Sequence, residues 1–390
     1  MFKSKINKDF NTKIIYNNKK LKFLGVFYNK KERIDKMNKF FKRVISAFMA
    51  FAVTLSMIAL SGTLENNISA ATTQSGTCGN NLTWTFDSSG TLTISGVGAM
   101  EDYAANFGST TAPWSGCNIT SVVIENGVTS VGNHAFYDCS NVKTVSIPGS
   151  VKSIGINAFA GCDLKTITVP EGVETIKYSA FANCSSLEQV ILPSTVSTIQ
   201  FSAFNDCRAL KEVNIPQKVT KLEDYIFYNC ALTNIEIPSG VESIGKGAFQ
   251  GCSGLTTITI PNGVKSIGNY AFQGCSGLTI IEIPGAVTSI GYNAFKNCTK
   301  LATASFESNN PPAFGTELFD NTAIVNENGK IYVPCGSPDA YKTAANMSAY
   351  GDYITGGSHS FDTAKWKADN ENHWHACTVC GAKQDEAPHI

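Results

Sequence analysis

Cysteine and histidine are the residues of this chain whose types and spacing point to chemistry, and one group of them lies at the C-terminus. There Cys377 and Cys380 form a Cys-x-x-Cys pair, and four of the five histidines surround it. Thiolate and imidazole together suit a tetrahedral zinc ion, and a tail of roughly 32 residues needs such a staple because it is too short to build a core. We therefore expect one structural zinc ion, with ligands from Cys377, Cys380, His389 and one of His373 or His375, and with His359 as an alternate ligand.

Two other interpretations of this tail stay open. Cys377 and Cys380 would form a disulfide in the first, and the tail would carry no ligand in the second. Covalent haem attachment is disfavoured, because that chemistry needs a histidine directly after the second cysteine and Gly381 stands there.

Nine other cysteines form a regular series, at 22- or 23-residue spacing, from Cys117 to Cys298. In an exported protein they could pair as disulfides. Each repeat offers only one cysteine, however, so no register would select a partner. We predict instead that Cys139 to Cys298 are buried, reduced residues that act as small apolar side chains. The members of the series are Cys117, Cys139, Cys162, Cys184, Cys207, Cys230, Cys252, Cys275 and Cys298.

The cysteine spacing belongs to a longer repeat, of which residues 252–275, CSGLTTITIPNGVKSIGNYAFQGC, are one copy. A fixed period of this length is typical of a solenoid, whose coils bury their apolar faces against each other. Alternation predicts a strand with Ile258 and Ile260 inward and Thr257 and Thr259 outward. Pro261 ends it, where a missing N–H costs the sheet little.

The second half of each copy predicts a second short extended piece, Val-x-x-Ile-Gly, and then a short helical or 3₁₀ turn that places a phenylalanine in the core. His134 precedes one such turn, and we expect it to be an exposed filler. One residue is missing directly after Cys117, Cys162 and Cys230, which marks a loop on the outside of the coil. The core phenylalanines are Phe136, Phe159, Phe181, Phe204, Phe227, Phe249, Phe272 and Phe295.

The frame Cys-x-x-Leu-x-x-Ile-x-Ile-Pro-x-x-Val-x-x-Ile-Gly-x-x-Ala-Phe-x-x-Cys resembles the BspA-like leucine-rich repeat of bacterial surface proteins, over about residues 78–340. Residues 78–96, with Pro113-Trp114 beyond them, resemble the N-terminal cap of that family. We expect one continuous right-handed solenoid with a parallel sheet. Residues 330–334 should form the last strand, and a closing helix should run from Tyr341 to Tyr350.

The N-terminal region predicts export. Lys42-Arg43 precede an apolar run from Val44 to Leu60, and Ile68-Ser69-Ala70 is a candidate cleavage site, which is the layout of a secretory signal. A transmembrane anchor is the alternative. We expect the following organisation: a basic extension or overcalled start over 1–36, a signal over 37–70, an N-terminal cap over 71–116, repeats over 117–320, a C-terminal cap over 321–358 and the Cys/His-rich tail over 359–390.

The charge distribution bears on partners. Beyond residue 70 the chain carries 17 Lys/Arg against 27 Asp/Glu, a net charge near −10. Nucleic-acid binding needs a clustered basic face, so we expect no nucleic-acid partner. We also expect no stable membrane span once the signal is removed.

The outward positions of the strands carry mostly polar side chains of low chemical reactivity. No histidine, cysteine or aspartate occurs among them, so we expect a binding protein rather than an enzyme. Glu212 and Glu236 lie on adjacent repeats, where exposed glutamates are more often a solvated face than an acid/base pair. The resemblance implies adhesion to host or neighbouring-cell macromolecules, protein or glycan, by a secreted or cell-surface protein. The alternative is a non-catalytic structural or targeting region of an exported enzyme system that acts on glycans or the cell wall. The predicted binding surface comprises Gln189, Glu212, Asn214, Asn234, Glu236, Thr257 and Thr259.

Overall fold

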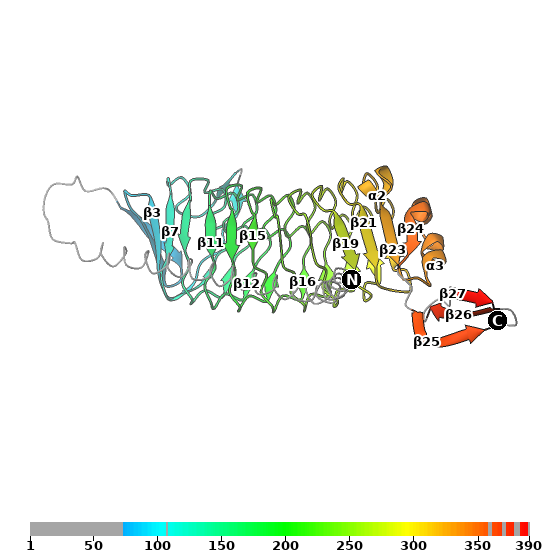
Figure 1. Ribbon diagram of the computed structural model, residues 1–390. Coiled ribbons are helices and arrows are strands. Elements are labelled where there is room, and N and C mark those ends of the chain that lie inside the picture. Colours follow the sequence, from blue (N-terminus) through cyan, green and yellow to red (C-terminus); the bar gives the residue numbers. More distant parts are fainter. Residues whose placement is uncertain (1–72, 107, 358–360, 369–371, 378–382, 389–390) are drawn as a thin grey trace, which may run out of the picture. The chain divides into compact units, whose positions relative to one another are not determined.

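The computed structural model describes residues 73–106, 108–357, 361–368, 372–377 and 383–388. From residue 73 to residue 357 the chain is a solenoid of successive coils, whose strands lie side by side along the molecule (Figure 1). The predicted signal and the basic extension before it lie outside the described residues. No helix in the described part of the chain has the length and apolar character needed to span a membrane.

The x-Ile-x-Ile segments form the first strand line, in which each strand pairs in parallel with that of the next coil. Ile167 pairs with Val190, and Val190 pairs with Val213. Their side chains point inward, as alternation predicts, and the predicted parallel solenoid is confirmed. The strands are β7 (Ser121–Ile124), β9 (Thr144–Ser146), β11 (Thr166–Thr168), β13 (Gln189–Ile191), β15 (Glu212–Val213), β19 (Ile280–Ile283), β21 (Thr303–Phe306), β23 (Lys330–Val333) and β24 (Ile354–Gly356).

The Val-x-x-Ile segments form the second strand line, which is also parallel. Its strands are short because a turn follows them at once. They are β4 (Gly98–Ala99), β8 (Val128–Val131), β10 (Ser153–Ile154), β12 (Thr175–Ile176), β14 (Thr198–Ile199), β16 (Lys221–Leu222), β17 (Ser243–Ile244), β18 (Ser266–Ile267), β20 (Ser289–Ile290) and β22 (Ala313–Phe314).

The parallel strand lines of the solenoid are divided into separate sheets. In the first strand line, pairing stops between β9 and β11, stops again after β15, and resumes at β19. Two of these stops fall in coils that lack the residue after Cys162 or Cys230. Shortening alone does not break the ladder, because the coil shortened after Cys117 carries β7, which pairs on both sides. The second strand line is interrupted once, between β14 and β16.

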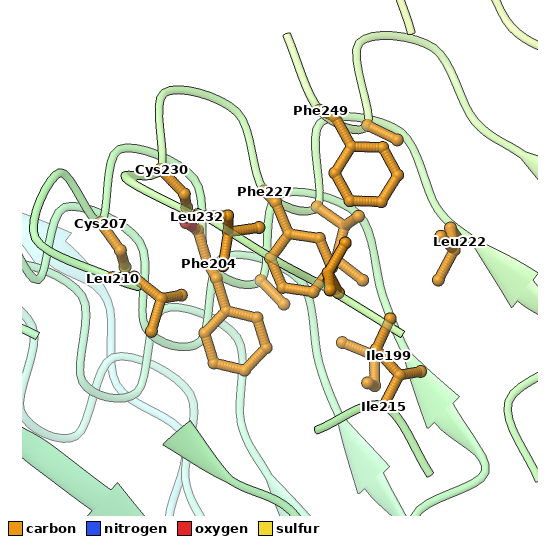
Figure 2. Close-up of a cluster of buried hydrophobic side chains, with 14 of the residues drawn as sticks. Ile199, Phe204, Cys207, Leu210, Ile215, Leu222, Phe227, Cys230, Leu232 and Phe249 are labelled. Carbon is orange, nitrogen blue, oxygen red and sulfur yellow. Dashed lines mark hydrogen bonds between the residues drawn. The ribbon is translucent and has the colours of Figure 1, made fainter. Parts of the chain in front are cut away.

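The core is built on a column of stacked aromatic rings, which confirms the predicted role of the phenylalanines. From Phe136 to Phe319, consecutive ring centroids are 5.0 to 5.8 Å apart and the ring planes agree within 23°. All of these side chains are fully buried. Figure 2 shows three of them, Phe204, Phe227 and Phe249, in one row with leucine and isoleucine side chains beside them.

The turn that carries each phenylalanine is a broken 3₁₀-type turn. The N–H groups of Ala271, Gln273 and Cys275 bond to the carbonyl three residues earlier, while those of Tyr270, Phe272 and Gly274 bond to the next coil. Residues such as Tyr270 (φ 59°) and Gly274 (φ 74°) are left-handed, and this alternation of partners keeps the turn from continuing as a helix. The turn therefore supplies a third line of hydrogen bonds between coils.

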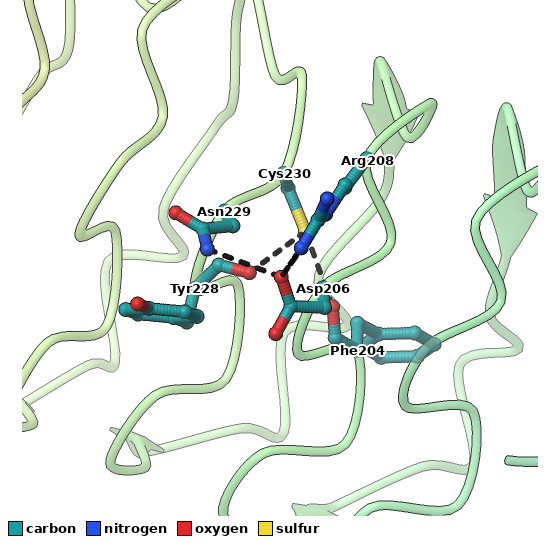
Figure 3. A network of polar contacts seen from close by, with 6 residues as sticks. All are labelled: Phe204, Asp206, Arg208, Tyr228, Asn229 and Cys230. Atoms are coloured by element: carbon teal, nitrogen blue, oxygen red, sulfur yellow. Dashed lines mark hydrogen bonds and ion pairs between the residues drawn. The ribbon is translucent and has the colours of Figure 1, made fainter. Parts of the chain in front are cut away.

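The residue before each cysteine explains part of the repeat frame. It has a positive φ and is aspartate, asparagine or glycine, the residues that tolerate this conformation best. Asn229 Nδ2 also donates to Asp206 Oδ1 of the preceding coil at 3.1 Å, and Arg208 Nη2 lies 3.2 Å from the same oxygen (Figure 3). The positions are Gly116, Asp138, Gly161, Asn183, Asp206, Asn229, Gly251, Gly274 and Asn297, and Asn321 holds the same place before Thr322.

The N-terminal end of the solenoid is closed by an antiparallel sheet and an aromatic cluster. β1 (Gln74–Gly79), β2 (Leu82–Phe86) and β3 (Thr91–Gly96) form the sheet, and β3 pairs with β7 in parallel. Trp114 stacks on Phe136 at 5.5 Å, and its Nε1 donates to Ala135 O at 2.8 Å. Trp84 and Tyr103 pack edge-on against Trp114. A small hairpin, β5 (Ala105–Asn106) with β6 (Ser109–Thr110), precedes this tryptophan.

The C-terminal end is closed by short helices, so the expected single helix from Tyr341 to Tyr350 is wrong. Instead α3 (Pro338–Thr343) and the 3₁₀ helix η1 (Ser348–Tyr353) are separate, and α2 (Ala323–Asn326) precedes them. Asn346 lies between α3 and η1 with a φ of 65°, which helical residues do not adopt. Tyr350 closes the aromatic column edge-on against Phe319. The expected last strand exists as β23, but β24 follows it.

In the tail, three strands form an antiparallel sheet: β25 (Phe361–Ala368), β26 (Asn372–Cys377) and β27 (Lys383–Pro388). Strand β26 lies in the middle and pairs with both others.

Candidate functional site

The outward side of the first strand line, which we call the first-line face, carries the residues proposed for binding, and all of them except Gln189 are exposed. Glu212, Asn234, Glu236, Thr257 and Thr259 are exposed. Gln189 is half-buried, and its Nε2 donates to Glu212 Oε2 on the neighbouring strand at 2.8 Å. Part of the hydrogen-bonding capacity of these two side chains is therefore already used within the protein.

Asn214 is used differently from its neighbours. Its Nδ2 donates to Leu192 O at 2.7 Å, and its Oδ1 accepts the Leu192 N–H at 2.8 Å. The side chain thus continues the backbone ladder just where β13 and β15 end, so Asn214 holds two coils together as well as facing outward. The four predicted residues from Asn234 to Thr259 lie in the stretch between β15 and β19.

The predicted zinc ligands fall in the tail sheet or beyond the described residues. His373, His375 and Cys377 occupy alternate positions of β26. His359, Cys380 and His389 lie outside the described residues.

His134 is not the exposed filler that the sequence indicates. It is half-buried with a φ of 53°, and its two ring nitrogens lie 3.0 Å from Tyr103 O and 3.1 Å from Asn157 Nδ2. It links the N-terminal cap to the next coil, a role that its neighbours in sequence do not reveal.

The cysteine series is present as free thiols, as predicted. From Cys162 to Cys298 each Sγ donates to the carbonyl of a phenylalanine in the preceding coil, at 3.0 to 3.3 Å. Burial raises the pKa of Cys184 and of Cys252 to about 12. These thiols are therefore structural and unreactive. Cys139 is half-buried rather than buried.

The structure adds one feature that the sequence interpretation missed, a shallow cavity of about 670 Å³ along the second strand line from β16 to β22. We call it the second-line groove. Its floor carries Ser243, Ser266 and Ser289 in register on β17, β18 and β20. In the described part of the chain, their hydroxyl groups form no hydrogen bond with another protein group.

Glycine recurs at one repeat position along the groove. Gly245, Gly268, Gly291 and Gly315 follow β17, β18, β20 and β22, whereas Glu223 follows β16 at the end of the groove. Outside the groove this position carries Lys177 and Gln200 after β12 and β14, and Gly132 and Gly155 after β8 and β10. A Cβ on Gly268 would lie 2.6 Å from the backbone of the preceding coil, so the close approach of the coils requires glycine. This run of glycines at one repeat position was the available sequence signal.

An aromatic and cationic cluster borders the groove. Lys246, which lines it, has its Nζ 5.4 Å from the ring centroid of Tyr225 and 6.0 Å from that of Tyr270. Tyr292 packs edge-on against Tyr270, with the centroids 4.6 Å apart. Asp224 and Asn269, also lining residues, each accept a backbone N–H of the next coil through Oδ1.

Comparison with known proteins gives repeat proteins and no match among curated proteins. A leucine-rich repeat protein from Eubacterium ventriosum is 21% identical, with 65% of this chain and 96% of that chain covered and a TM-score of 0.38. A leucine-rich repeat protein from T. pallidum is 29% identical, with 40% and 76% covered and a TM-score of 0.38. A leucine rich cell surface protein from Faecalibacterium prausnitzii is 23% identical, with 61% and 96% covered and a TM-score of 0.23.

The sequence itself matches the model of the BspA type leucine rich repeat region, in six copies over residues 112–232 and 220–333. The model describes a repeat, and no enzyme family is indicated. These residues contain most strands of the two strand lines, the phenylalanine column and the cysteine series described above. The chain belongs to the BspA-type leucine-rich repeat family.

Proposed function

We propose that this protein is a secreted or cell-surface binding protein that adheres to a host or neighbouring-cell macromolecule through its first-line face. The observation that carries the proposal is the exposure of Glu212, Asn234, Glu236, Thr257 and Thr259 on successive coils above a buried apolar core. A broad polar face of this kind suits a large partner, because small molecules prefer concave and mostly apolar sites.

Non-catalytic binding fits the rest of the chain. In the described residues, no group of three or more histidine, cysteine, aspartate or glutamate side chains is arranged to hold a metal ion. The buried thiols are occupied by hydrogen bonds to carbonyl groups, as shown above. The repeat is thus used for shape and packing, and the variable outward positions are left for recognition.

The test is adhesion of the purified protein to host cells and to immobilised matrix proteins. We expect Asn234→Lys combined with Thr257→Trp to weaken adhesion, because both side chains are exposed in the middle of the face. Thr198→Lys combined with Thr220→Trp is the matched control, since these exposed positions belong to the other strand line or its approach. Equal adhesion by the two folded variants would remove the first-line face as the site.

We also propose that the tail binds one structural zinc ion through Cys377, Cys380, His389 and His373 or His375. The donor set supports this, since thiolates and imidazoles are the ligands of structural zinc sites. Elemental analysis of the full chain should give about one zinc per molecule, and Cys377→Ser should lose it. Cys252→Ser, which changes a buried thiol of the solenoid, should keep it. Zinc-free wild-type protein, purified without chelator, would favour the disulfide instead.

A further inference from the structure

The second-line groove has a chemical character of its own, distinct from that of the first-line face. Its lining includes three serines in register and four glycines, and Lys246 at its side lies over the rings of Tyr225 and Tyr270. Since the three serines have no protein partner in the described residues, their hydroxyl groups are available both to donate and to accept.

Three classes of partner fit this groove poorly. An added peptide strand needs a free sheet edge, but β17, β18 and β20 are each paired on both sides. An amphipathic helix needs an apolar groove, whereas the lining isoleucines Ile244, Ile267 and Ile290 are buried in the core and offer such a helix almost no apolar surface. A nucleic acid needs a cluster of cations, whereas Lys221 is paired with Glu223 at 2.6 Å and Asp224 lies beside Lys246 in the lining.

A sugar chain satisfies the same features. A pyranose ring presents hydroxyl groups at its edge, which pair with serine hydroxyls, and C–H groups on its faces, which pack on aromatic rings. The length of one sugar unit along a linear chain is close to the strand spacing of ~4.8 Å, so successive sugar rings meet successive coils. From β16 to β22 there are four such spacings, roughly 19 Å in all.

We propose that the second-line groove binds a neutral, unbranched polysaccharide. Ser243, Ser266 and Ser289 hydrogen-bond to hydroxyls of successive sugar units, and Tyr225 and Tyr270 pack against ring faces at the border. The proposal rests on the proposed function only in that the protein is a binding protein; it uses a different surface and would survive the loss of adhesion through the first-line face.

The test is electrophoresis of the full chain in native gels that contain xylan, glucomannan or hydroxyethyl cellulose. At least one of these should retard the protein. Ser243→Gln with Ser266→Gln fills the floor and should weaken binding roughly tenfold, as the loss of two hydrogen bonds implies. Ser153→Gln with Thr175→Gln is the matched control, because these residues hold the same strand positions on β10 and β12, outside the groove. Thermal melting checks that both variants are folded.

Further outcomes decide the proposal. Tyr270→Ala should also weaken retardation, and the adhesion variant Asn234→Lys with Thr257→Trp should leave it unchanged. Retardation by none of the neutral polysaccharides, or an equal effect of the groove and control variants, would overturn the proposal. Retardation by polygalacturonate alone would also overturn it and would assign the groove to an anionic glycan held by Lys246.

Discussion

At the scale of single residues, two side chains recur in every coil for different physical reasons. The phenylalanine supplies buried area and ring stacking. The cysteine is small enough for the crowded turn, and its S–H reaches a carbonyl of the preceding coil that also accepts a backbone N–H. A serine would offer a stronger donor at a greater desolvation cost, which explains why a thiol suits this place.

Truncating a ring in the column tests its contribution. Phe272→Ala should lower the free energy of unfolding by about 3–5 kcal/mol, because a fully buried ring between two stacked neighbours is removed. Phe201→Ala is the control, since that ring is 47% exposed and should cost far less. Urea denaturation followed by circular dichroism measures both. Similar losses for the two variants would contradict the column as the main source of stability.

The buried thiols predict alkaline sensitivity. Burial raises the pKa of Cys252 from the ordinary 9.0 to about 12. The unfolded chain therefore releases this proton first, so the stabilising contribution is complete below about pH 9 and is lost as the pH rises towards 12. Urea midpoints measured between pH 8 and pH 11 should fall, and they should fall less steeply in Cys252→Ala. An unchanged slope in this variant would exclude the thiol as a cause.

At the scale of the element, the turn after each second-line strand decides how closely two coils approach. A Cβ on Gly268 would meet the backbone of Gly245 and Lys246 at 2.6 Å. Coils with lysine, glutamine or glutamate at this position occur directly around the break between β14 and β16. Strands followed by these residues still pair, β12 with β14 and β16 with β17, so glycine at this position accompanies the groove and not the pairing itself.

Gly268→Ala tests this requirement. The added methyl group should destabilise the solenoid by about 1–3 kcal/mol, the usual cost of overpacking. Ser266→Ala, two residues earlier and outward-facing, should change stability by less than about 0.5 kcal/mol. Thermal and urea denaturation compare the two variants. A neutral Gly268→Ala would show that the coils separate without cost and that glycine is present for another reason.

At the scale of the whole molecule, stability is shared between neighbouring coils, and the ends need caps. Trp114 closes the aromatic column at one end and Tyr350 at the other. Both side chains also bond to the polypeptide they cover, Trp114 Nε1 to Ala135 O and Tyr350 Oη to Asp320.

Removing a cap should loosen only its own end. In Trp114→Ala we expect faster amide hydrogen exchange in β7, β8 and β9 and unchanged exchange in β20 and β21, because interactions in a solenoid reach only adjacent coils. Hydrogen exchange read by mass spectrometry distinguishes these segments. Uniformly faster exchange over the whole solenoid would show a single cooperative unit instead.

The sequence by itself determined the repeat, its period, the inward isoleucines, the phenylalanine column and the reduced thiols. Each of these follows from residue type and spacing, because a coil of fixed length places equivalent residues above one another. It also placed Glu212, Asn234 and Thr257 outward, since alternation along a strand needs no knowledge of other coils.

Only the tertiary structure decided features that depend on contacts between coils. These are the breaks in the first strand line, the ladder made by the Asn214 side chain, the buried link through His134 and the second-line groove. Each depends on how two adjacent coils meet, as at Gly268, where a Cβ would lie 2.6 Å from the backbone of the preceding coil. A one-dimensional pattern gives the order of residues in a coil, but the offset between adjacent coils is set by packing along the entire solenoid.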